Sequence, residues 1–283
     1  MVTSPSGRIA VVITTYNNPQ SLELCLLSLR DQTFQNFEVH IADDGSKDET
    51  RDLLLRLKRE LLFEIYHHWH PDEGYRKAKI NNSVFRDLDR NRVGIVVCID
   101  HDVILHHRFV EDHFLAHKKA AFGPLLFMGR RVDLGPRLSK KINSQNIFKF
   151  QRGLGPALVA SAICGETKNV LRSVRIDGPG WLLRILKRDR VYDLLGSNYS
   201  IDLKSLLEVN GYNEDYKGYW GEDGDLFVRV RNRGIKFFGI IGYAVQWHIF
   251  HKRLEETPEH VKEYQSLLAN TSYVECKNGI VKK

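Results

Sequence analysis

Two aspartates end an apolar run in the stretch VGIVVCIDHDVIL, residues 93–105. Asp100 and Asp102 are two residues apart, with His101 between them. Isolated charges are costly to bury unless they are paired or bind a metal. Two carboxylates at a strand end can hold a hard divalent cation such as Mg²⁺ or Mn²⁺, and such a cation can bridge the phosphates of a nucleotide. The alternative is a turn in which one aspartate caps the next helix.

Two earlier apolar runs also end in polar residues. IAVVITT ends at Thr15 and is followed by Tyr16, and FEVHIA is followed by Asp43 and Asp44. Thr15 and Tyr16 could contact a base or ribose, and either aspartate could accept the ring N–H of a pyrimidine. The sequence DDGS is also favourable for a turn, and both roles can hold together.

The elements that would position these residues alternate between strand and helix patterns. Apolar, β-branched runs predict strands within 9–15, 37–42, 61–68 and 93–100, with helices between them. Asn18 and Pro19 suit the start of the first helix, while Ser46 and Glu49 fit a capping box for the second. Ligands of such open sheets bind beyond the carboxyl ends of the strands, so the three polar ends should converge.

The predicted third helix, EGYRKAKINNSVFRDL, carries two basic residues one turn apart. Arg76 and Lys79 suit a diphosphate, although a solvated basic helix face has the same pattern. No G-x-G-x-x-G motif follows the first strand, which disfavours a dinucleotide-binding fold.

The first half of the chain resembles a known family. VVITTYNNPQSLELCLLSLRDQT, VHIADDGSKDET, GYRKAKINN and CIDHDVIL resemble successive blocks of the family-two glycosyltransferases of the GT-A fold, which use nucleotide-sugar donors. The resemblance implies that Asp44 or Asp43 binds the base. It also implies that Asp100 and Asp102 bind metal and diphosphate, with His101 beside them in the donor site.

The second half is similar to the acceptor region of β-1,4-galactosyltransferases and bacterial chondroitin-type polymerases. The matching blocks are NGY (210–212) and WGEDGD (220–225). Tyr212 stands where the family has phenylalanine, and Gly224 where the galactosyltransferases have a third consecutive acid. The segment from 120 to 190 lies outside the resemblance.

The resemblance implies Asp223 as the catalytic base. Inverting transfer needs one group that deprotonates the acceptor hydroxyl. Trp220 and Tyr219, in the expected acceptor site, can stack on sugar faces, and Glu222 would hold acceptor or donor hydroxyls. The alternative for GEDGD is an acidic helix N-terminus favoured by the helix dipole, which leaves Trp220 unexplained.

A histidine pair in QWHIFHKR completes the expected metal site. His248 and His251 are three residues apart, and the related galactosyltransferases place metal ligands at two positions with this spacing. With Asp100 and Asp102 they would bind Mn²⁺, with Mg²⁺ as the alternative, because a nitrogen ligand favours Mn²⁺. Apart from His101, the other histidines, including those at 67–70, receive no role.

Charge is unevenly distributed along the chain. The net charge is +7, but residues 121–190 alone carry +10. This segment is either a solvated insert or a surface for anionic lipid or an anionic acceptor. Within it, GWLLRILKRDRVYDLL can form an amphipathic helix with four apolar residues on one face: Trp181, Leu182, Ile185 and Leu186. No nucleic-acid recognition motif is present, so no nucleic-acid partner is expected.

Other features suggest the compartment. No apolar run reaches the ~18 residues of a membrane-spanning helix, and the start of the sequence lacks the apolar core of a secretory signal. Cys25 and Cys98 lie inside apolar runs, as buried thiols in a reducing compartment do. We therefore expect a cytoplasmic protein, which could lie peripherally at the inner face of the membrane.

These observations predict one α/β domain of the GT-A type, an open mixed sheet flanked by helices. Residues 1–115 would bind the donor, 116–195 form a variable basic insert, and 196–283 bind the acceptor and carry out catalysis. The expected activity is metal-dependent, inverting transfer of galactose or N-acetylgalactosamine from a UDP-sugar to a saccharide or lipid-linked saccharide, in polysaccharide or lipopolysaccharide synthesis.

Two alternatives are weaker. The block VVCIDHDV also fits haloacid-dehalogenase-type phosphatases, but that family usually carries it near the N-terminus, and here it forms the fourth strand. A non-catalytic carbohydrate-binding protein that retains the fold would not need Asp223, Asp100 and Asp102 intact.

Overall fold

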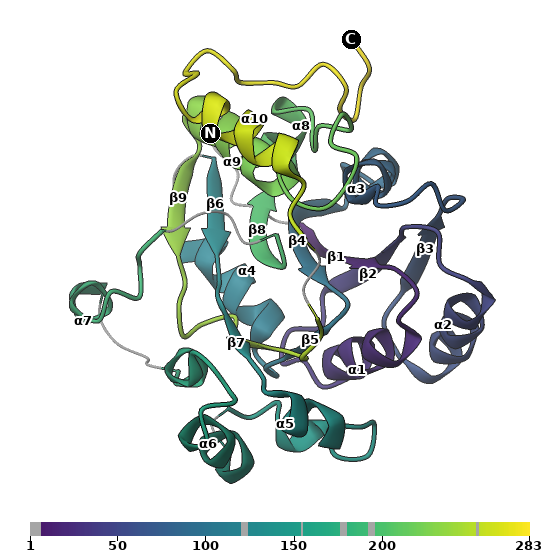
Figure 1. The fold of residues 1–283 in the computed structure, drawn as a ribbon, viewed down its shortest axis with the longest axis vertical. Coiled ribbons are helices and arrows are strands. Elements are labelled where there is room, and N and C mark those ends of the chain that lie inside the picture. Colours follow the sequence, from purple (N-terminus) through teal and green to yellow (C-terminus); the bar gives the residue numbers. More distant parts are fainter. Residues whose placement is uncertain (1–6, 120–123, 154, 176–179, 192–195, 253–254) are drawn as a thin grey trace.

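A computed structural model describes residues 7–119, 124–153, 155–175, 180–191, 196–252 and 255–283. Its strands form a seven-stranded sheet in the order β3-β2-β1-β4-β8-β6-β9 and a three-stranded sheet in the order β5-β10-β7, with helices around them (Figure 1). The strands are β1 (Arg8–Thr15), β2 (Phe37–Asp43), β3 (Ile65–Trp69), β4 (Val93–Asp100), β5 (Val103–Leu105), β6 (Leu125–Met128), β7 (Arg131–Asp133), β8 (Asn198–Asp202), β9 (Lys236–Gly239) and β10 (Gln246–His248). This mixed α/β architecture confirms the predicted fold class.

Helices cover both faces of the main sheet. They are α1 (Pro19–Arg30), α2 (Asp48–Glu60), α3 (Lys77–Asp87), α4 (Phe109–Lys119), α5 (Pro136–Lys141), α6 (Pro156–Ile163), α7 (Gly180–Ile185), α8 (Leu203–Glu208), α9 (Glu222–Asn232) and α10 (Pro258–Leu268), with 3-10 turns η1 (Ile147–Lys149) and η2 (Val170–Ser173). One core holds side chains of α1, α2 and α4, and the other holds side chains of α3, α8 and α9. No helix in the described ranges is both long and apolar enough to cross a bilayer.

The four strands of the sequence prediction are present and parallel to one another. β1 lies between β2 and β4, with Thr14 opposite Asp100 and Thr15 opposite Asp43. Residues 9–13 are fully buried, which explains the unbroken apolar run, because a central parallel strand is covered on both faces. The parallel arrangement brings the polar ends of these strands to one edge, as expected.

The starts of the first two helices differ in how well they were predicted. The Asn18 side chain accepts a hydrogen bond from the Ser21 N–H, which confirms the predicted cap of α1. The capping box at Ser46 is wrong: α2 begins at Asp48, after Lys47. The Ser46 N–H instead donates to Asp43 Oδ1 at 2.8 Å. The DDGS turn therefore holds the Asp43 carboxylate and does not cap the helix.

The second half of the chain contributes strands to both sheets. Near the end of the chain, β9 belongs to the main sheet and β10 to the small one. Residues 125–128, inside the expected basic insert, form β6 between β8 and β9. The expected domain boundaries remain a prediction, but this segment supplies part of the sheet. The side chains of Trp181 and Leu182 lie outside the described part of the expected amphipathic helix.

Candidate active site

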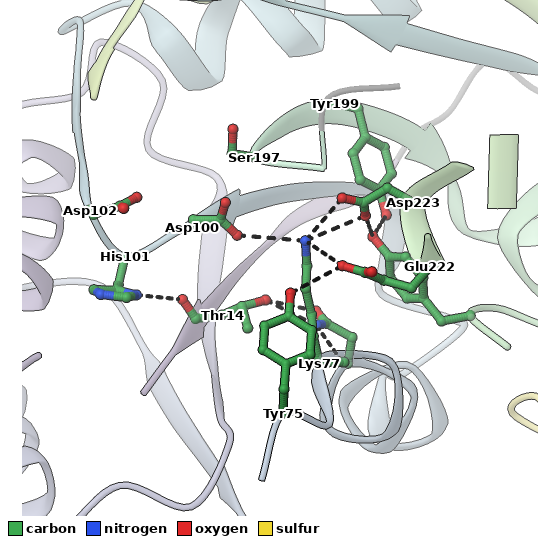
Figure 2. A network of polar contacts seen from close by, with 12 residues as sticks. Thr14, Tyr75, Lys77, Asp100, His101, Asp102, Ser197, Tyr199, Glu222 and Asp223 are labelled. Atoms are coloured by element: carbon green, nitrogen blue, oxygen red, sulfur yellow. Dashed lines mark hydrogen bonds and ion pairs between the residues drawn. The ribbon is translucent and has the colours of Figure 1, made fainter. Parts of the chain in front are cut away.

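A lysine for which the sequence pattern predicted no role lies among the acids at the end of β4 and the start of α9. Lys77 is the first residue of α3, and its Nζ is 3.1 Å from Asp223 Oδ2, 3.5 Å from Glu222 Oε1 and 3.8 Å from Asp100 Oδ1 (Figure 2). Three segments therefore meet at this ammonium group: the end of β4, the start of α3 and the start of α9.

Opposing effects act on the Lys77 ammonium group. Burial disfavours its charged form, but the Asp223 and Asp100 carboxylates outweigh burial and hold the pKa of Lys77 well above its usual value. The lysine is thus a fixed positive charge among three acids. A cation in this position can also meet the negative charge of a phosphate group.

The expected base, Asp223, is held on two sides. Its Oδ1 accepts a hydrogen bond from the Tyr212 hydroxyl at 3.1 Å, while Lys77 lies beside both oxygens. Gly196 provides the space, since a Cβ there would lie 2.0 Å from Asp223 Oδ2. The side chain stays 24% exposed, so the carboxylate is anchored and still open to a substrate.

Glu222 lies deeper than its neighbour Asp223. Its Oε1 accepts a hydrogen bond from the Tyr75 hydroxyl at 3.1 Å, and its buried Oε2 has no hydrogen-bond partner among the described residues. Burial and the neighbouring Asp223 charge raise the pKa of Glu222 to about 7. Near neutral pH, Glu222 can therefore carry a proton, which allows it to donate as well as accept a hydrogen bond.

The raised pKa of Glu222 predicts a pH-dependent stability. The folded protein takes up this proton at a higher pH than the unfolded chain, so the ionised form destabilises the fold increasingly as pH rises from about 4.5 to about 7. Glu222→Gln, which cannot ionise, should gain stability relative to the wild type across this range, by on the order of 2–3 kcal/mol.

Urea unfolding of both proteins at intervals from pH 4.5 to pH 8 measures this difference. Glu49→Gln, at an exposed position of α2, is the matched control. A difference between Glu222→Gln and the wild type that stays constant with pH would contradict the raised pKa of Glu222.

The histidine pair joins Asp102 rather than both aspartates. His248 Nε2 lies 3.2 Å and His251 Nε2 2.8 Å from Asp102 Oδ2, and one ligand atom from each of the three residues falls within 4.8 Å of the others. Antiparallel pairing of β10 with β5 sets His248 opposite Val103 and so brings the pair to Asp102. Asp100 lies outside this set and approaches Lys77 instead, so its expected role as a metal ligand stays a prediction.

These three residues fit a divalent metal ion. Asp102 Oδ1 is buried and has no hydrogen-bond partner among the described residues, so an acceptor oxygen is free for a cation. Although burial opposes ionisation, hydrogen bonds from His248 and His251 hold the pKa of Asp102 well below its usual range. One carboxylate and two imidazoles form a mixed oxygen and nitrogen donor set, which suits Mn²⁺ and related ions.

The acids at the end of β2 are oriented by histidines that received no role from the sequence. His67 Nε2 is 2.8 Å from Asp43 Oδ2, and His70 Nε2 is 2.7 Å from Asp44 Oδ1. Asp44 Oδ2 also accepts the Arg76 N–H at 2.8 Å, and burial raises the pKa of Asp44. Since β3 pairs in parallel with β2, strand adjacency was the signal that could have revealed these partners.

The other residues expected to bind the nucleotide-sugar donor differ in how deeply they are buried. Thr15 is buried, and its hydroxyl oxygen has no partner among the described residues, while Tyr16 is half-exposed and donates to Asp72 at 2.7 Å. The Arg76 guanidinium donates to the Tyr75 carbonyl, and Lys79 pairs with Glu73 at the surface.

Neither expected basic side chain reaches the acid cluster. Lys77, which directly follows Arg76, reaches it instead, because it faces inward at the start of α3. His101 remains at the end of β4, where its backbone N–H donates to the Thr14 carbonyl at 3.0 Å.

The aromatic residues before the acids lie in a loop held by α10. Tyr219 packs edge-on against Tyr75, and Trp220 packs edge-on against Tyr264. Trp220 has a left-handed backbone, with φ of 81°, and its carbonyl lies 2.7 Å from His260 Nδ1. Non-glycine residues at positive φ persist only where their surroundings hold them. The contacts with Tyr264 and His260 therefore hold Trp220 in place two residues before Glu222.

The last acid of WGEDGD is structural. Asp225 is fully buried, forms an ion pair with Arg229, and accepts a hydrogen bond from Tyr273 at 2.9 Å. The Arg229 guanidinium also donates to the carbonyls of Val209 and Gly211. Acids two residues apart thus have separate tasks, with Asp223 facing the cluster and Asp225 holding α9 in place.

Family models match both halves of the chain. The model described as glycosyl transferase family 2 matches residues 10–158, and one described as the N-terminal domain of galactosyltransferase matches residues 186–252. These matches cover the two regions in which the sequence resembled known glycosyltransferases.

Curated relatives carry related names. Validoxylamine A glucosyltransferase of Streptomyces hygroscopicus subsp. jinggangensis is 27% identical over 235 residues, which cover 82% of this chain and 53% of that protein. Chondroitin synthase of Escherichia coli is 23% identical over 257 residues, covering 85% of this chain and 34% of that protein. The chain thus spans about half the length, or less, of these relatives.

Solved structures show the same fold. Staphylococcus aureus TarS 1–349 in complex with UDP has a TM-score of 0.60 at 16% identity, covering 93% of this chain and 65% of that one. The mannosyltransferase PcManGT from Pyrobaculum calidifontis, in complex with GDP-Man and Mn²⁺, has a TM-score of 0.56 at 17% identity, covering 95% and 71%. The GT-A fold is confirmed, and since the family model spans more than half of the sequence, the chain belongs to glycosyl transferase family 2.

Proposed function

We propose that this protein is a metal-dependent, inverting glycosyltransferase that moves a sugar from a UDP-sugar to a saccharide acceptor. The observation that carries the proposal is the meeting of Asp223 and Lys77 at the end of β4. A partly exposed carboxylate and a buried cation lie together where open α/β sheets bind their ligands. That juxtaposition provides a base and a partner for phosphate within one cluster.

Each residue of the cluster has a task in this reaction. Asp223 takes the proton of the acceptor hydroxyl, and its hydrogen bond from Tyr212 fixes the carboxylate. Glu222, held by the Tyr75 hydroxyl beside Asp223, would hold a substrate hydroxyl. Lys77 balances the negative charge of the diphosphate. Asp44, held in place by His70, accepts a hydrogen bond from the ring N–H of the donor's uracil.

The metal would be held by Asp102, His248 and His251. A divalent ion bound there would neutralise charge on the departing diphosphate. We favour Mn²⁺ over Mg²⁺ because two of the three ligands are imidazoles. A structural neighbour in complex with Mn²⁺ supports this choice.

The sugar and the acceptor are also proposals. We favour galactose or N-acetylgalactosamine as the sugar, because of the resemblance of residues 196–234 to galactosyltransferases and the match of residues 186–252. Neighbours in complex with UDP and UDP-GlcNAc support a UDP-sugar donor. Relatives named as chondroitin and hyaluronan synthases support a saccharide acceptor and a place in polysaccharide synthesis.

A donor screen tests the proposed function. Purified protein with Mn²⁺ is incubated with UDP-galactose, UDP-N-acetylgalactosamine, UDP-glucose, UDP-N-acetylglucosamine and GDP-mannose, and release of the free nucleotide is measured with and without a panel of oligosaccharides. We expect release from UDP-galactose or UDP-N-acetylgalactosamine, stimulated by an acceptor. Release from GDP-mannose alone would overturn the choice of UDP, and hydrolysis of p-nitrophenyl phosphate instead would support the phosphatase alternative.

We further propose that the protein works at the inner face of an anionic membrane. Helix α6 has the apolar sequence PALVASAI, yet Val159 and Ile163 are exposed. The adjoining turn η2 exposes Leu171, and Lys168 and Arg172 provide positive charge beside it. Exposed apolar side chains with a basic border suit a bilayer that contains acidic lipids.

Hydrogen bonds and helix packing connect this exposed surface to the strand that carries His248. The Leu134 N–H donates to the His248 carbonyl, and the Phe250 N–H donates to Ser139 Oγ on α5, which packs against α6. A membrane at α6 would therefore bring a lipid-linked saccharide near the site.

Vesicle flotation tests the membrane contact. The protein should float with vesicles of phosphatidylglycerol and phosphatidylcholine at low salt and detach at high salt, as screening predicts. Ile163→Ser should weaken flotation. Leu62→Ser, which changes a fully exposed leucine between α2 and β3, is the matched control and should float like the wild type. No flotation at low salt would exclude the membrane contact.

A further inference from the structure

An aspartate on β7 lies behind one of the histidines of the proposed metal site. Parallel pairing of β10 with β7 sets Asp133 opposite His248. The Nε2 atom of His248 is 3.2 Å from Asp102 Oδ2, whereas its Nδ1 atom is 3.8 Å from Asp133 Oδ1. The imidazole ring therefore presents one nitrogen to the metal site and the other nitrogen to a second carboxylate.

Other residues hold the Asp133 carboxylate in place. The Arg131 Nε–H donates to Asp133 Oδ1 at 2.9 Å, and the Asn169 side-chain amide donates to Asp133 Oδ2 at 3.0 Å. Backbone hydrogen bonds in both directions, of 3.2 and 2.9 Å, also join Asp133 to Lys168. The position of this carboxylate is thus set independently of His248.

The separation of 3.8 Å has a chemical reason. A neutral imidazole has one N–H group and one nitrogen with a free electron pair. In this structure His248 donates a hydrogen bond to Asp102 through Nε2, so its Nδ1 faces Asp133 without a proton, at a distance too long for a hydrogen bond. A bound ion needs the electron pair of Nε2. The proton of the ring must then lie on Nδ1, where Asp133 Oδ1 is the acceptor that β7 provides.

The second histidine already shows the arrangement that an ion requires. His251 Nδ1 is 2.9 Å from the Lys252 carbonyl oxygen, which can only accept, so this nitrogen carries a proton. His251 Nε2 faces Asp102. Histidines that bind metals usually donate their other ring N–H to a carbonyl or carboxylate. A backbone carbonyl serves His251 in this way, and Asp133 is the corresponding acceptor for His248.

We propose that Asp133 is a positioning residue that accepts a hydrogen bond from His248 Nδ1–H when a divalent ion is bound, and so directs Nε2 to the ion. The inference rests on the metal site of the proposed function. It also gives the basic segment 121–190 a role in the reaction, because Asp133 and its partners Arg131 and Asn169 all belong to that segment.

Binding of Mn²⁺ alone tests this role without any substrate. Free Mn²⁺ is measured by electron paramagnetic resonance as the ion is titrated with protein. Asp133→Asn should raise the Kd for Mn²⁺ about 10–100-fold, the usual effect of losing the partner of a metal ligand. Asn169→Gly removes one donor that orients Asp133, and glycine suits the φ of 62° at this position. It should raise the Kd by less.

Asp87→Asn is the matched control. It makes the same chemical change at an aspartate whose Oδ2 is 3.2 Å from the Nδ1 of His68, a histidine outside the metal site. The Kd for Mn²⁺ should stay at the wild-type value. An unchanged Kd in Asp133→Asn, or an equal rise in Asp87→Asn, overturns the proposal.

The ring proton of His248 distinguishes positioning from a purely structural effect. In protein labelled with ¹⁵N at histidine and loaded with diamagnetic Zn²⁺, the Nδ1–H signal of His248 is assigned by its loss in His248→Gln. This proton should resonate at low field, as a proton hydrogen-bonded to a carboxylate does, and should move upfield in Asp133→Asn. A raised Kd without this movement would mean that Asp133 only packs against His248, and would overturn the proposal.

The proposed function can fail separately from this inference. If Asp133→Asn weakens Mn²⁺ binding and moves the ring signal while the wild type transfers no sugar, the role of Asp133 stands and the proposed function is rejected. If the wild type binds no Mn²⁺, the metal site and the role of Asp133 are both rejected.

Discussion

Asp223→Asn should lower sugar transfer about 10²–10⁴-fold, the usual contribution of a general base. The amide keeps the size of the side chain and can still accept the Tyr212 hydrogen bond, but it cannot take a proton from the acceptor hydroxyl. UDP binding should change little, because other residues make the proposed contacts. Asp44 would bind the uracil ring, and Asp102 with the histidine pair would bind the metal.

Calorimetry with UDP and Mn²⁺, read beside the rate of nucleotide release, separates these two effects. Asp215→Asn makes the same chemical change at an exposed site seven residues before α9, and it should retain normal transfer. If Asp223→Asn transferred sugar at a near-normal rate, another group would have to be the base.

The second large effect is expected at the metal site. Asp102→Asn should weaken Mn²⁺-dependent UDP binding by about 10²-fold or more, since loss of a residue that only supports a ligand already costs about 10–100-fold. The change removes the negative charge of the carboxylate that meets His248 and His251. Transfer should fall with it, as it should when a chelator is added to the wild type, and Mn²⁺ should restore the wild type best.

Asp100→Asn is the informative comparison for Asp102→Asn. The structure pairs Asp100 with Lys77 and leaves it outside the histidine cluster, so its loss should weaken metal-dependent binding less. If both variants lost metal-dependent UDP binding to the same extent, both aspartates would be metal ligands, as the sequence predicted. Full transfer by the wild type in excess chelator would reject the metal site altogether.

The sequence by itself determined the outline of the fold. Apolar runs of strand length and helices with one apolar side follow directly from local periodicity, and β1, α1, β2 and β4 appear where the patterns placed them. The rule that ligands bind at the carboxyl ends of parallel strands then correctly predicted that the polar ends of β1, β2 and β4 lie at one edge of the sheet. Local patterns were sufficient because each of these features depends on neighbours in the chain.

The choice between neighbouring residues was decided only by the tertiary structure. Arg76, Lys77 and Lys79 are chemically similar and adjacent, and which of them faces the acids depends on where α3 begins, a boundary that sequence patterns locate poorly. Lys77 faces the acids because it is the first helical residue.

Partners that come from distant strands were likewise invisible in the sequence. The register of β10 against β5 brings His248 to Asp102 and leaves Asp100 to Lys77. The pairing of β2 with β3 brings His67 and His70 to the acids of DDGS. Strand order and register depend on the packing of the whole sheet, so sequence supplied the residue types of the site, and the tertiary structure determined which of them meet.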